Sequence, residues 1–211
     1  MDKNYKNIIS VRGTIVSIHT DMRKTTMRIA TDGGSGKGLD SEDKSYYPEI
    51  VFYTTNIGER FSVRRDHVEI KAHIHTWYNR NEKKNVTEYV GDSIVRTSRF
   101  LADYFSNIDE EGANPDDENI VILSGKVSKI DKRDSGGNLV VLSISIPDKE
   151  NESHIDNCRV TCFRKNAQYA HRNLAKGDFV AIGGRIHTSR NRETGEPMQN
   201  VVCRDIAKLK V

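Results

Sequence analysis

The stretch NIISVRGTI at residues 7–15 returns as NIVILSGKV at residues 119–127, with asparagine, isoleucine and glycine at matching places. A second stretch, IHTWYNR at 74–80, returns as IHTSRNR at 186–192, with five of seven residues identical. Both pairs are separated by the same offset of 112 residues. Two anchors at one offset indicate that a single structural unit has been duplicated.

The segment between the two copies differs from both of them in composition. Residues 98–106 (SRFLADYFS) form an amphipathic pattern with a serine cap, which predicts a short helix. The linker that follows, NIDEEGANPDDE, holds six acids and no base. We therefore divide the chain into a first domain at 1–97, a connecting segment at 98–118 and a second domain at 119–211.

The charge of the chain is distributed unevenly along this division. The overall net charge is +3, but residues 1–106 carry +3, the acidic linker at 107–118 carries −6 and residues 119–211 carry +6. Both halves are therefore basic, and the linker masks this in the total. Basic domains are compatible with a polyanionic partner.

Each copy predicts five strands rich in β-branched residues. A glycine inside the first strand is typical of the bends that barrels require. Between the third and fourth strands of the second copy, Asn166–Leu174 predicts one short helix. Five strands in this order are typical of the OB-fold, so we expect a mainly all-β chain of two tandem five-stranded OB-fold barrels. The expected strands are 8–18, 25–31, 49–55, 68–77 and 86–95 in the first copy, and 119–127, 139–146, 158–164, 179–188 and 199–209 in the second.

Alternation along the strands assigns side chains to the two faces. The inward set is apolar or small: Val68, Ile70, Ala72 and Ile74 in the first copy, and Cys158, Val160, Cys162, Val180, Ile182, Gly184 and Ile186 in the second. The outward set is polar or aromatic: Lys71, His73, His75, Trp77, Arg159, Thr161, Phe163, Arg185 and His187.

No catalytic constellation is present in the sequence. The loop Gly33–Gly38 contains a Gly-Lys pair but lacks the first glycine and the Ser/Thr of a P-loop, so we interpret it as a flexible hairpin loop. Its Lys37 and the nearby Lys44 could touch DNA. The pair His73-x-His75 has no cysteine or carboxylate cluster at zinc spacing beside it. We predict a protein that is not an enzyme and has no cofactor and no metal site.

Cysteine usage and hydropathy bear on the compartment. Three cysteines, Cys158, Cys162 and Cys203, are too few and odd in number for a disulfide framework. No apolar run approaches the roughly 20 residues of a membrane span, and residues 1–13 lack the pattern of a signal peptide. We expect a cytoplasmic protein without membrane contact.

Several short motifs in the second copy occur in a recognisable order. They are Asn119 with Gly125, Phe163 with Lys165, Lys176-Gly177-Asp178 and Gly184-Arg185-Ile186; the first copy adds Thr87-Glu88-Tyr89-Val90. In this order the chain resembles the bacterial and phage single-stranded DNA-binding protein family, as two copies that cover nearly its whole length. The resemblance implies a barrel face on which aromatic rings stack on bases.

The resemblance places one aromatic pair six residues apart on the third strand. This gives Tyr47 and Tyr53 in the first copy, and Asn157 and Phe163 in the second, which therefore lacks one stacking ring. Trp77 falls near the family's hairpin aromatic. Tyr53 and Phe163 also suit half-buried packing positions. The full set of expected DNA contacts is Tyr47, Tyr53, Lys71, Trp77, Tyr78, Arg80, Arg159, Phe163, Arg164, Lys165, Arg185, Arg190 and Arg192.

The expected function is sequence-tolerant binding and protection of single-stranded DNA in replication, recombination or repair. Two barrels per chain suggest a homodimer with the four barrels usual for the family, and a compact duplicated form suits a phage or mobile element. Family members often recruit partners through an acidic tail, but this sequence ends at Ala207–Val211 after the last strand, so we expect no such recruitment. The alternatives are an OB-fold protein-interaction or dimerisation module of a replication or recombination complex, and an RNA-binding OB protein.

Overall fold

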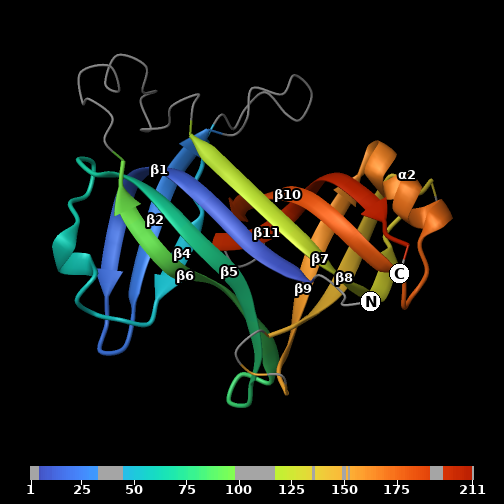
Figure 1. Ribbon diagram of the computed structural model, residues 1–211, viewed down its shortest axis with the longest axis horizontal. Helices are drawn as coiled ribbons and strands as arrows, with labels where there is room; N and C mark the ends of the chain where they lie inside the picture. The colour runs from blue at the N-terminus through green and yellow to red at the C-terminus, as the bar shows by residue number, and fades with distance from the viewer. Residues whose placement is uncertain are drawn as a thin grey trace.

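The computed structural model describes residues 5–32, 45–97, 117–134, 136–148, 151, 153–190 and 197–210. These residues form eleven strands and one α-helix (Figure 1). The first half holds β1 Lys6–Thr20, β2 Thr25–Asp32, β3 Ser45–Tyr46, β4 Glu49–Phe52, β5 His67–Asn79 and β6 Lys84–Arg96, with a 3-10 turn at Gly58–Arg60. The second half holds β7 Glu118–Lys132, β8 Leu139–Pro147, β9 Ile155–Phe163, α2 Arg164–Asn173, β10 Phe179–Arg190 and β11 Pro197–Lys208.

All the strands belong to one continuous sheet that closes on itself twice. In the first half, β1 pairs with β2 on one side and β5 on the other, and β4 and β6 complete the ring. In the second half, β7 pairs in the same way with β8 and β10, and β9 and β11 complete the ring. This is the five-stranded OB-fold barrel built twice, as the sequence predicted.

The duplication extends to the irregularities of the strands. The bulge at Ile15/Ser17 in β1 has its counterpart at Val127/Lys129 in β7. The bulge at Lys71/Ala72 in β5 has its counterpart at Gly183/Gly184 in β10. Bulges bend strands and set the closure of a barrel, so the two copies share their curvature as well as their strand order.

The two barrels are joined through their first strands. β1 and β7 run antiparallel, from Lys6↔Ser124 to Arg12↔Glu118, and Ile9↔Val121 lies at the centre. Because Ile9 and Val121 are themselves equivalent residues of the two copies, a pseudo-twofold axis passes through this pair. Figure 1 shows β1 and β7 side by side between the barrels.

One asparagine in each copy connects the two stretches that reveal the duplication. Asn119 donates from Nδ2 to the carbonyl of Ile186 at 2.8 Å, and the Ile186 N–H donates to Asn119 Oδ1 at 2.8 Å. Asn7 makes the same two bonds with Ile74, at 2.7 and 2.9 Å. Each asparagine replaces the backbone pair that would follow the last β1–β5 or β7–β10 pair. The N–H and carbonyl groups of Ile74 and Ile186 therefore keep hydrogen-bond partners.

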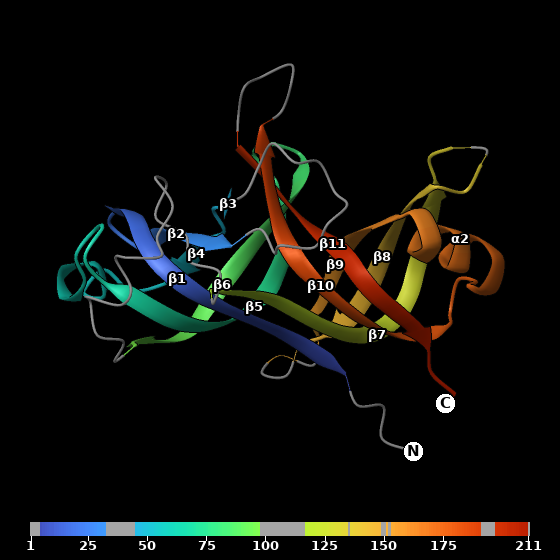
Figure 2. The same ribbon diagram turned by 90° about the horizontal axis from the view of Figure 1, so that it is seen from above.

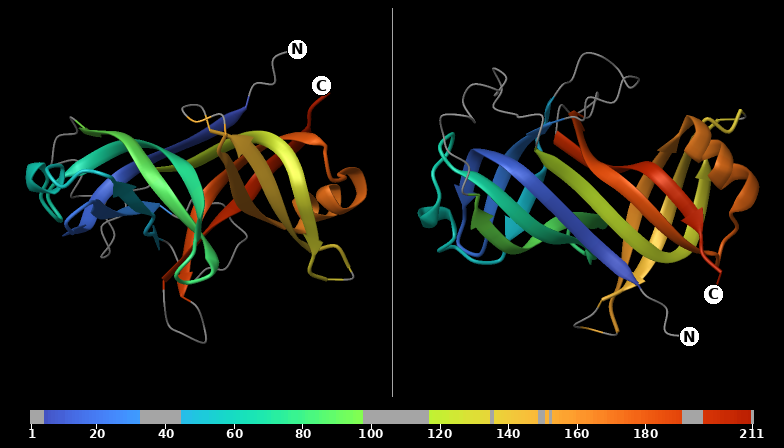
Figure 3. Two further views of the ribbon diagram at one scale, coloured as in Figure 1. Left: turned by 90° about the horizontal axis from the view of Figure 1, so that it is seen from below. Right: turned by 45° about the horizontal axis from the view of Figure 1, so that its top comes forward.

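Each barrel extends one hairpin toward the other. Figures 2 and 3 show the β5–β6 and β10–β11 hairpins leaving the same side of the molecule. Thr76 of β5 accepts through Oγ1 from the Asn157 N–H at 2.8 Å. Its counterpart Thr188 of β10 accepts from the Tyr47 N–H at 3.2 Å. The barrels are therefore held by reciprocal contacts as well as by the sheet.

The end of the acidic linker docks onto the first barrel. Asp117 accepts from His67 Nε2 at 2.7 Å, and both side chains are buried. His67 Nδ1 also contacts the hydroxyl of Thr97. In the sequence, Thr97 precedes the segment 98–116 and Asp117 follows it. Glu118 forms an ion pair with Arg12 at 3.1 Å. The predicted helix at 98–106 lies outside the described residues.

The sequence placed the core correctly and misplaced a few element ends. The inward residues predicted for β5, β9 and β10 are all buried, Cys158 and Cys162 among them, and Cys203 of β11 is buried as well. The third strand of the first copy ends at Phe52 rather than Thr55, and β9 begins at Ile155, three residues early. The helix begins at Arg164, two residues before its predicted start, and buries Ala167 and Ala170 against the barrel. Neither helical segment in the described ranges is long and apolar enough to cross a bilayer.

Candidate nucleic-acid interface

The outer face of β8 and β9 carries a row of side chains that alternate with the core. Arg159 lies opposite Ser143, and Phe163 lies opposite Leu139 at the end of the strand. The Phe163 side chain is 37% exposed, although its inward neighbour Cys162 is fully buried. An aromatic ring and a guanidinium on one open strand face can stack on a base and neutralise a phosphate.

The equivalent face of the first barrel is formed by β2 and β4. Tyr47 precedes β4, and the guanidinium carbon of Arg28 lies 5.6 Å from the centre of its ring. Tyr53 follows β4 and is 57% exposed. The same strand position is therefore aromatic and exposed in both barrels, at Tyr53 and Phe163.

The Tyr53 ring is held in place by its hydroxyl group. The hydroxyl donates to Glu88 Oε2 at 2.6 Å, and Lys24 Nζ binds the other oxygen of Glu88 at 2.9 Å. Partial burial and the Glu88 carboxylate raise the pKa of the Tyr53 hydroxyl well above its ordinary value. The hydroxyl therefore stays protonated and keeps this bond, which fixes the ring of a residue that remains exposed to solvent.

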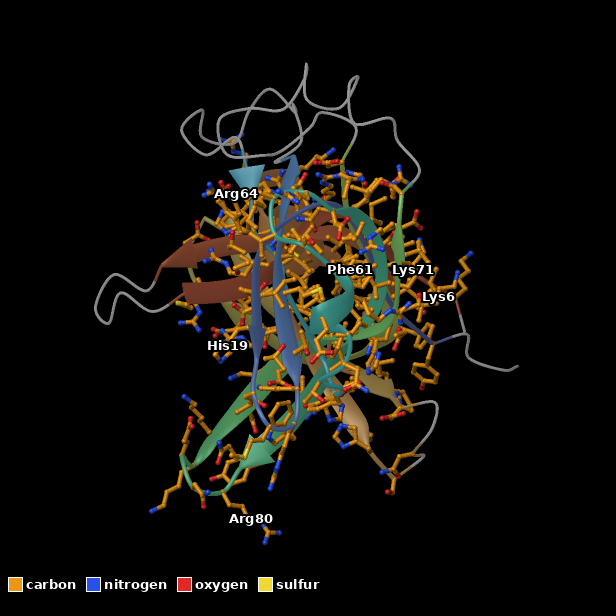
Figure 4. The ribbon with its side chains drawn as sticks, turned by 90° about the vertical axis from the view of Figure 1, so that its left-hand side faces the viewer. Lys6, His19, Phe61, Arg64, Lys71 and Arg80 are labelled. Atoms are coloured by element: carbon orange, nitrogen blue, oxygen red, sulfur yellow. The ribbon has the colours of Figure 1, made fainter. Side chains whose placement is uncertain are left out.

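The β5–β6 hairpin adds further rings and charges. Trp77 is half-buried and stacks on His75, with ring centroids 5.6 Å apart and planes at 28°. Tyr78 is 58% exposed. Arg80 lies at the tip of the hairpin, away from the barrel body (Figure 4). The outward assignment of Trp77 is therefore correct, with one face of the ring covered by His75.

Other predicted contacts lie elsewhere. Lys71 is exposed, but it binds Ser10 Oγ and Glu69 Oε1, each at 2.8 Å, on the β1–β5 side of the barrel (Figure 4). Lys165 lines an open pocket with Tyr169 and residues of β10 and β11. Arg164 begins α2 with a positive φ of 50° and is exposed. The Arg190 side chain, Arg192, Lys37 and Lys44 lie outside the described residues.

The expected exposure of Arg185 is wrong. The side chain points away from its own barrel, as alternation predicted, but it is only 7% exposed. Its guanidinium carbon lies 4.5 Å from the centre of the Tyr46 ring, at the contact between the barrels. A residue that is outward for one barrel can be covered by the other, and this removes Arg185 from the open surface.

Two residues of this surface were missed by the sequence reasoning. Arg28 and Lys24 belong to β2 and the turn before it. The signal was present, because Arg28 alternates with the buried Met27 and Ile29. Together with Arg159 of the second barrel, they add positive charge to the faces formed by β2, β4, β8 and β9.

The chain is similar to known single-strand binding proteins. The model of the single-strand binding protein family matches residues 118–207. The wild-type single-stranded DNA-binding protein from Thermus aquaticus has a TM-score of 0.67 at 15% identity, over 98% of this chain and 94% of that chain. A deletion mutant of that protein gives 0.66 at 16% identity, over 98% and 96%. At these identities the structural likeness establishes the fold. No curated protein matches the chain in sequence.

Proposed function

We propose that the chain binds single-stranded DNA without sequence preference, because the model of the single-strand binding protein family matches its second domain over residues 118–207. That family consists of DNA-binding proteins rather than enzymes. The observation that supports the proposal best is the exposed ring at one strand position in both barrels, Tyr53 and Phe163. We further propose that the bound strands are protected during replication, recombination or repair.

The chemistry of the surface suits an unpaired strand. Bases that are not paired expose flat apolar faces, and stacking on an aromatic ring contributes about 1–3 kcal/mol per base. Such stacking accepts every base, which accounts for sequence tolerance. Arg28 lies against the Tyr47 ring, and Arg159 lies on the same strand as Phe163. Both would neutralise phosphates, with release of counterions. A duplex hides its base faces and would gain only the charge contribution.

The two barrels would contribute differently. The first offers Tyr47 before β4 and Tyr53 after it, whereas the second has Asn157 at the position of Tyr47. The Asn157 amide oxygen contacts Ser145 Oγ at 2.9 Å, so this position is polar and engaged. We propose that the first barrel binds mainly by stacking and that the second depends more on Arg159 and its neighbours.

This function is tested by titrating labelled oligo-dT with the full chain and following fluorescence anisotropy. We expect the affinity for dT to fall about 50-fold between about 50 and about 200 mM salt if about four phosphates are contacted. Duplex DNA of the same length should bind much more weakly, and oligo-rU reports any RNA preference. Absence of binding to long dT at low salt would contradict the proposal and favour a protein-interaction module.

We also propose that two chains associate through the outer face of β1 and β7. Ile8, Ile120 and Ile122 are each 37–41% exposed there, and Ile8 pairs directly with Ile122. The patch surrounds the pseudo-twofold axis, so a second chain would bring four barrels together. The outward isoleucines have no role in either barrel core, which is consistent with a role in contact between chains.

Light scattering should therefore give twice the chain mass, and Ile122→Asp should shift the mass toward that of one chain, because a carboxylate would be buried in the contact. Met22→Asp, at a position that is 99% exposed, is the control and should leave the mass unchanged. A single-chain mass for the unaltered protein at micromolar concentration would contradict the dimer.

We also propose that the two domains span residues 1–97 and 119–211. The proposed compartment is the cytoplasm, where the three thiols would remain reduced.

A further inference from the structure

Four potential metal ligands converge where the β5–β6 hairpin meets the second barrel. They are His75, Asp148, His154 and Asp156, and one ligand atom of each lies within 4.8 Å of the others. His75 comes from β5 of the first barrel. The other three lie around the connection between β8 and β9. Residues 79 positions apart in the sequence thus share one cluster, which is why the spacing of His73-x-His75 gave no sign of it.

Two distances within the cluster are close to those of a tetrahedral site. His154 Nε2 lies 3.2 Å from Asp156 Oδ1, and His75 Nδ1 lies 3.5 Å from the same oxygen. Zinc binds imidazole nitrogen and carboxylate oxygen at about 2.0–2.2 Å, so neighbouring ligand atoms of a tetrahedron are about 3.4 Å apart. The two imidazole rings lie side by side, with centroids 4.9 Å apart. The distances from Asp156 Oδ1 to the two imidazole nitrogens are therefore already close to the required spacing.

Asp156 is held as a ligand would be. Its side chain is 3% exposed, and Oδ1 accepts from the Thr76 N–H at 2.7 Å and the Thr76 hydroxyl at 3.3 Å. Asn7 Nδ2 lies 3.5 Å from Oδ2. The ion pairs that the described residues offer this buried carboxylate come from the two imidazoles. Orienting hydrogen bonds around a ligand are a regular feature of metal sites, and a divalent cation would balance a buried negative charge that imidazoles alone balance poorly.

The pseudo-equivalent contact on the other side shows that the fold does not require this cluster. There Thr188 binds the Tyr47 N–H as Thr76 binds that of Asn157, so Tyr46 occupies the place of Asp156. His187, the counterpart of His75, packs edge-on against the Tyr46 ring at 5.1 Å. The carboxylate with two imidazoles thus occurs at one of these two equivalent contacts. Its oxygen and nitrogen atoms could bind a metal ion, whereas the other contact is made by packed rings.

We propose that His75, Asp148, His154 and Asp156 bind one divalent transition-metal ion of the zinc type. Imidazole and carboxylate ligands in a four-coordinate arrangement suit zinc. Because His75 belongs to one barrel and the other ligands to the second, the ion fastens the β5–β6 hairpin to the neighbouring barrel. It also fixes the ring on which Trp77 stacks. The proposal stands on these contacts and does not depend on DNA binding.

The test uses the full chain after treatment with a chelator. Zn²⁺ is titrated by calorimetry and by the emission of Trp77, the single tryptophan, which stacks on His75. We expect one ion per chain, a change in Trp77 emission and a higher melting temperature, since the ion binds the folded state. Co²⁺ should give the visible absorption of a four-coordinate ion without thiolate bands, which separates the site from the three cysteines.

Matched variants locate the site. His154→Ala removes a half-exposed ligand and should weaken zinc binding by at least about 10-fold and abolish the zinc-dependent rise in melting temperature. His75→Gln should have the same effect. It tests the site independently if the His154→Ala variant does not fold. His187→Gln, at the equivalent position of the other copy, should bind zinc as the unaltered chain does. Failure of the unaltered chain to bind zinc would overturn the proposal. So would zinc binding by both ligand variants that is as tight as that of the unaltered chain.

Discussion

Gly13→Ala is expected to lower the free energy of unfolding by about 3 kcal/mol, the upper end of the range for overpacking a core. A Cβ atom at Gly13 would overlap the carbonyl oxygen of Ala30 in β2. Because the obstacle is backbone, no side chain can turn aside to make room. The equivalent glycine, Gly125, meets the Ser145 carbonyl oxygen at 2.7 Å. Each glycine therefore permits its first strand to close on the second.

Urea denaturation followed by circular dichroism measures this loss. Gly183→Ala is the matched control, because a Cβ there has its nearest neighbour, Asp205 Cβ, at 3.9 Å, an ordinary contact. We expect that variant to change the stability by less than about 1 kcal/mol. Equal stability of the Gly13 and Gly183 variants would mean that the barrel does not close as described.

Loss of both equivalent rings should have the largest effect on DNA affinity. Tyr53→Ala and Phe163→Ala each remove an exposed ring from the same strand position. At about 1–3 kcal/mol per stacked base, the double variant should bind oligo-dT roughly 30-fold or more weaker. Anisotropy titration at fixed low salt measures the change, and the slope of affinity against salt should be preserved because the cations remain.

Tyr53→Phe separates the ring from its hydroxyl. This variant loses the bond to Glu88 but keeps the aromatic face, so it should retain nearly all of the affinity. If instead it lost as much affinity as Tyr53→Ala, the hydroxyl rather than the stacking surface would be responsible. Unchanged affinity of the double alanine variant would show that the strand runs over a different face.

The barrels could be predicted from the sequence because the patterns that specify them lie within single strands. The anchors at 7–15 and 119–127 contain the asparagine and glycine whose contacts the structure explains. Alternation identified Ile70 and Ile182 as core, since a strand with one buried face must repeat every two residues. It also placed Trp77 outside the core.

Contacts between the barrels could not be predicted in the same way. Alternation says only whether a side chain faces its own barrel, so Arg185 was assigned to solvent although Tyr46 covers it. Asp156 was not recognised because its partners, His75 and Thr76, come from the other copy. Such contacts depend on how β1 and β7 orient the barrels, which no local pattern encodes.

The most direct test of the proposed function is ultraviolet crosslinking of the chain to oligo-dT, with the crosslinked peptides identified by mass spectrometry. The outer faces of β2–β4 and β8–β9 carry the exposed rings, so we predict crosslinks at Tyr53 and Phe163, with further ones on the hairpin at Trp77 or Tyr78. Excess unlabelled single strand should remove them, whereas excess duplex should not. Crosslinks confined to the β1–β5 side around Lys71, or none from a bound complex at either ring, would contradict the account.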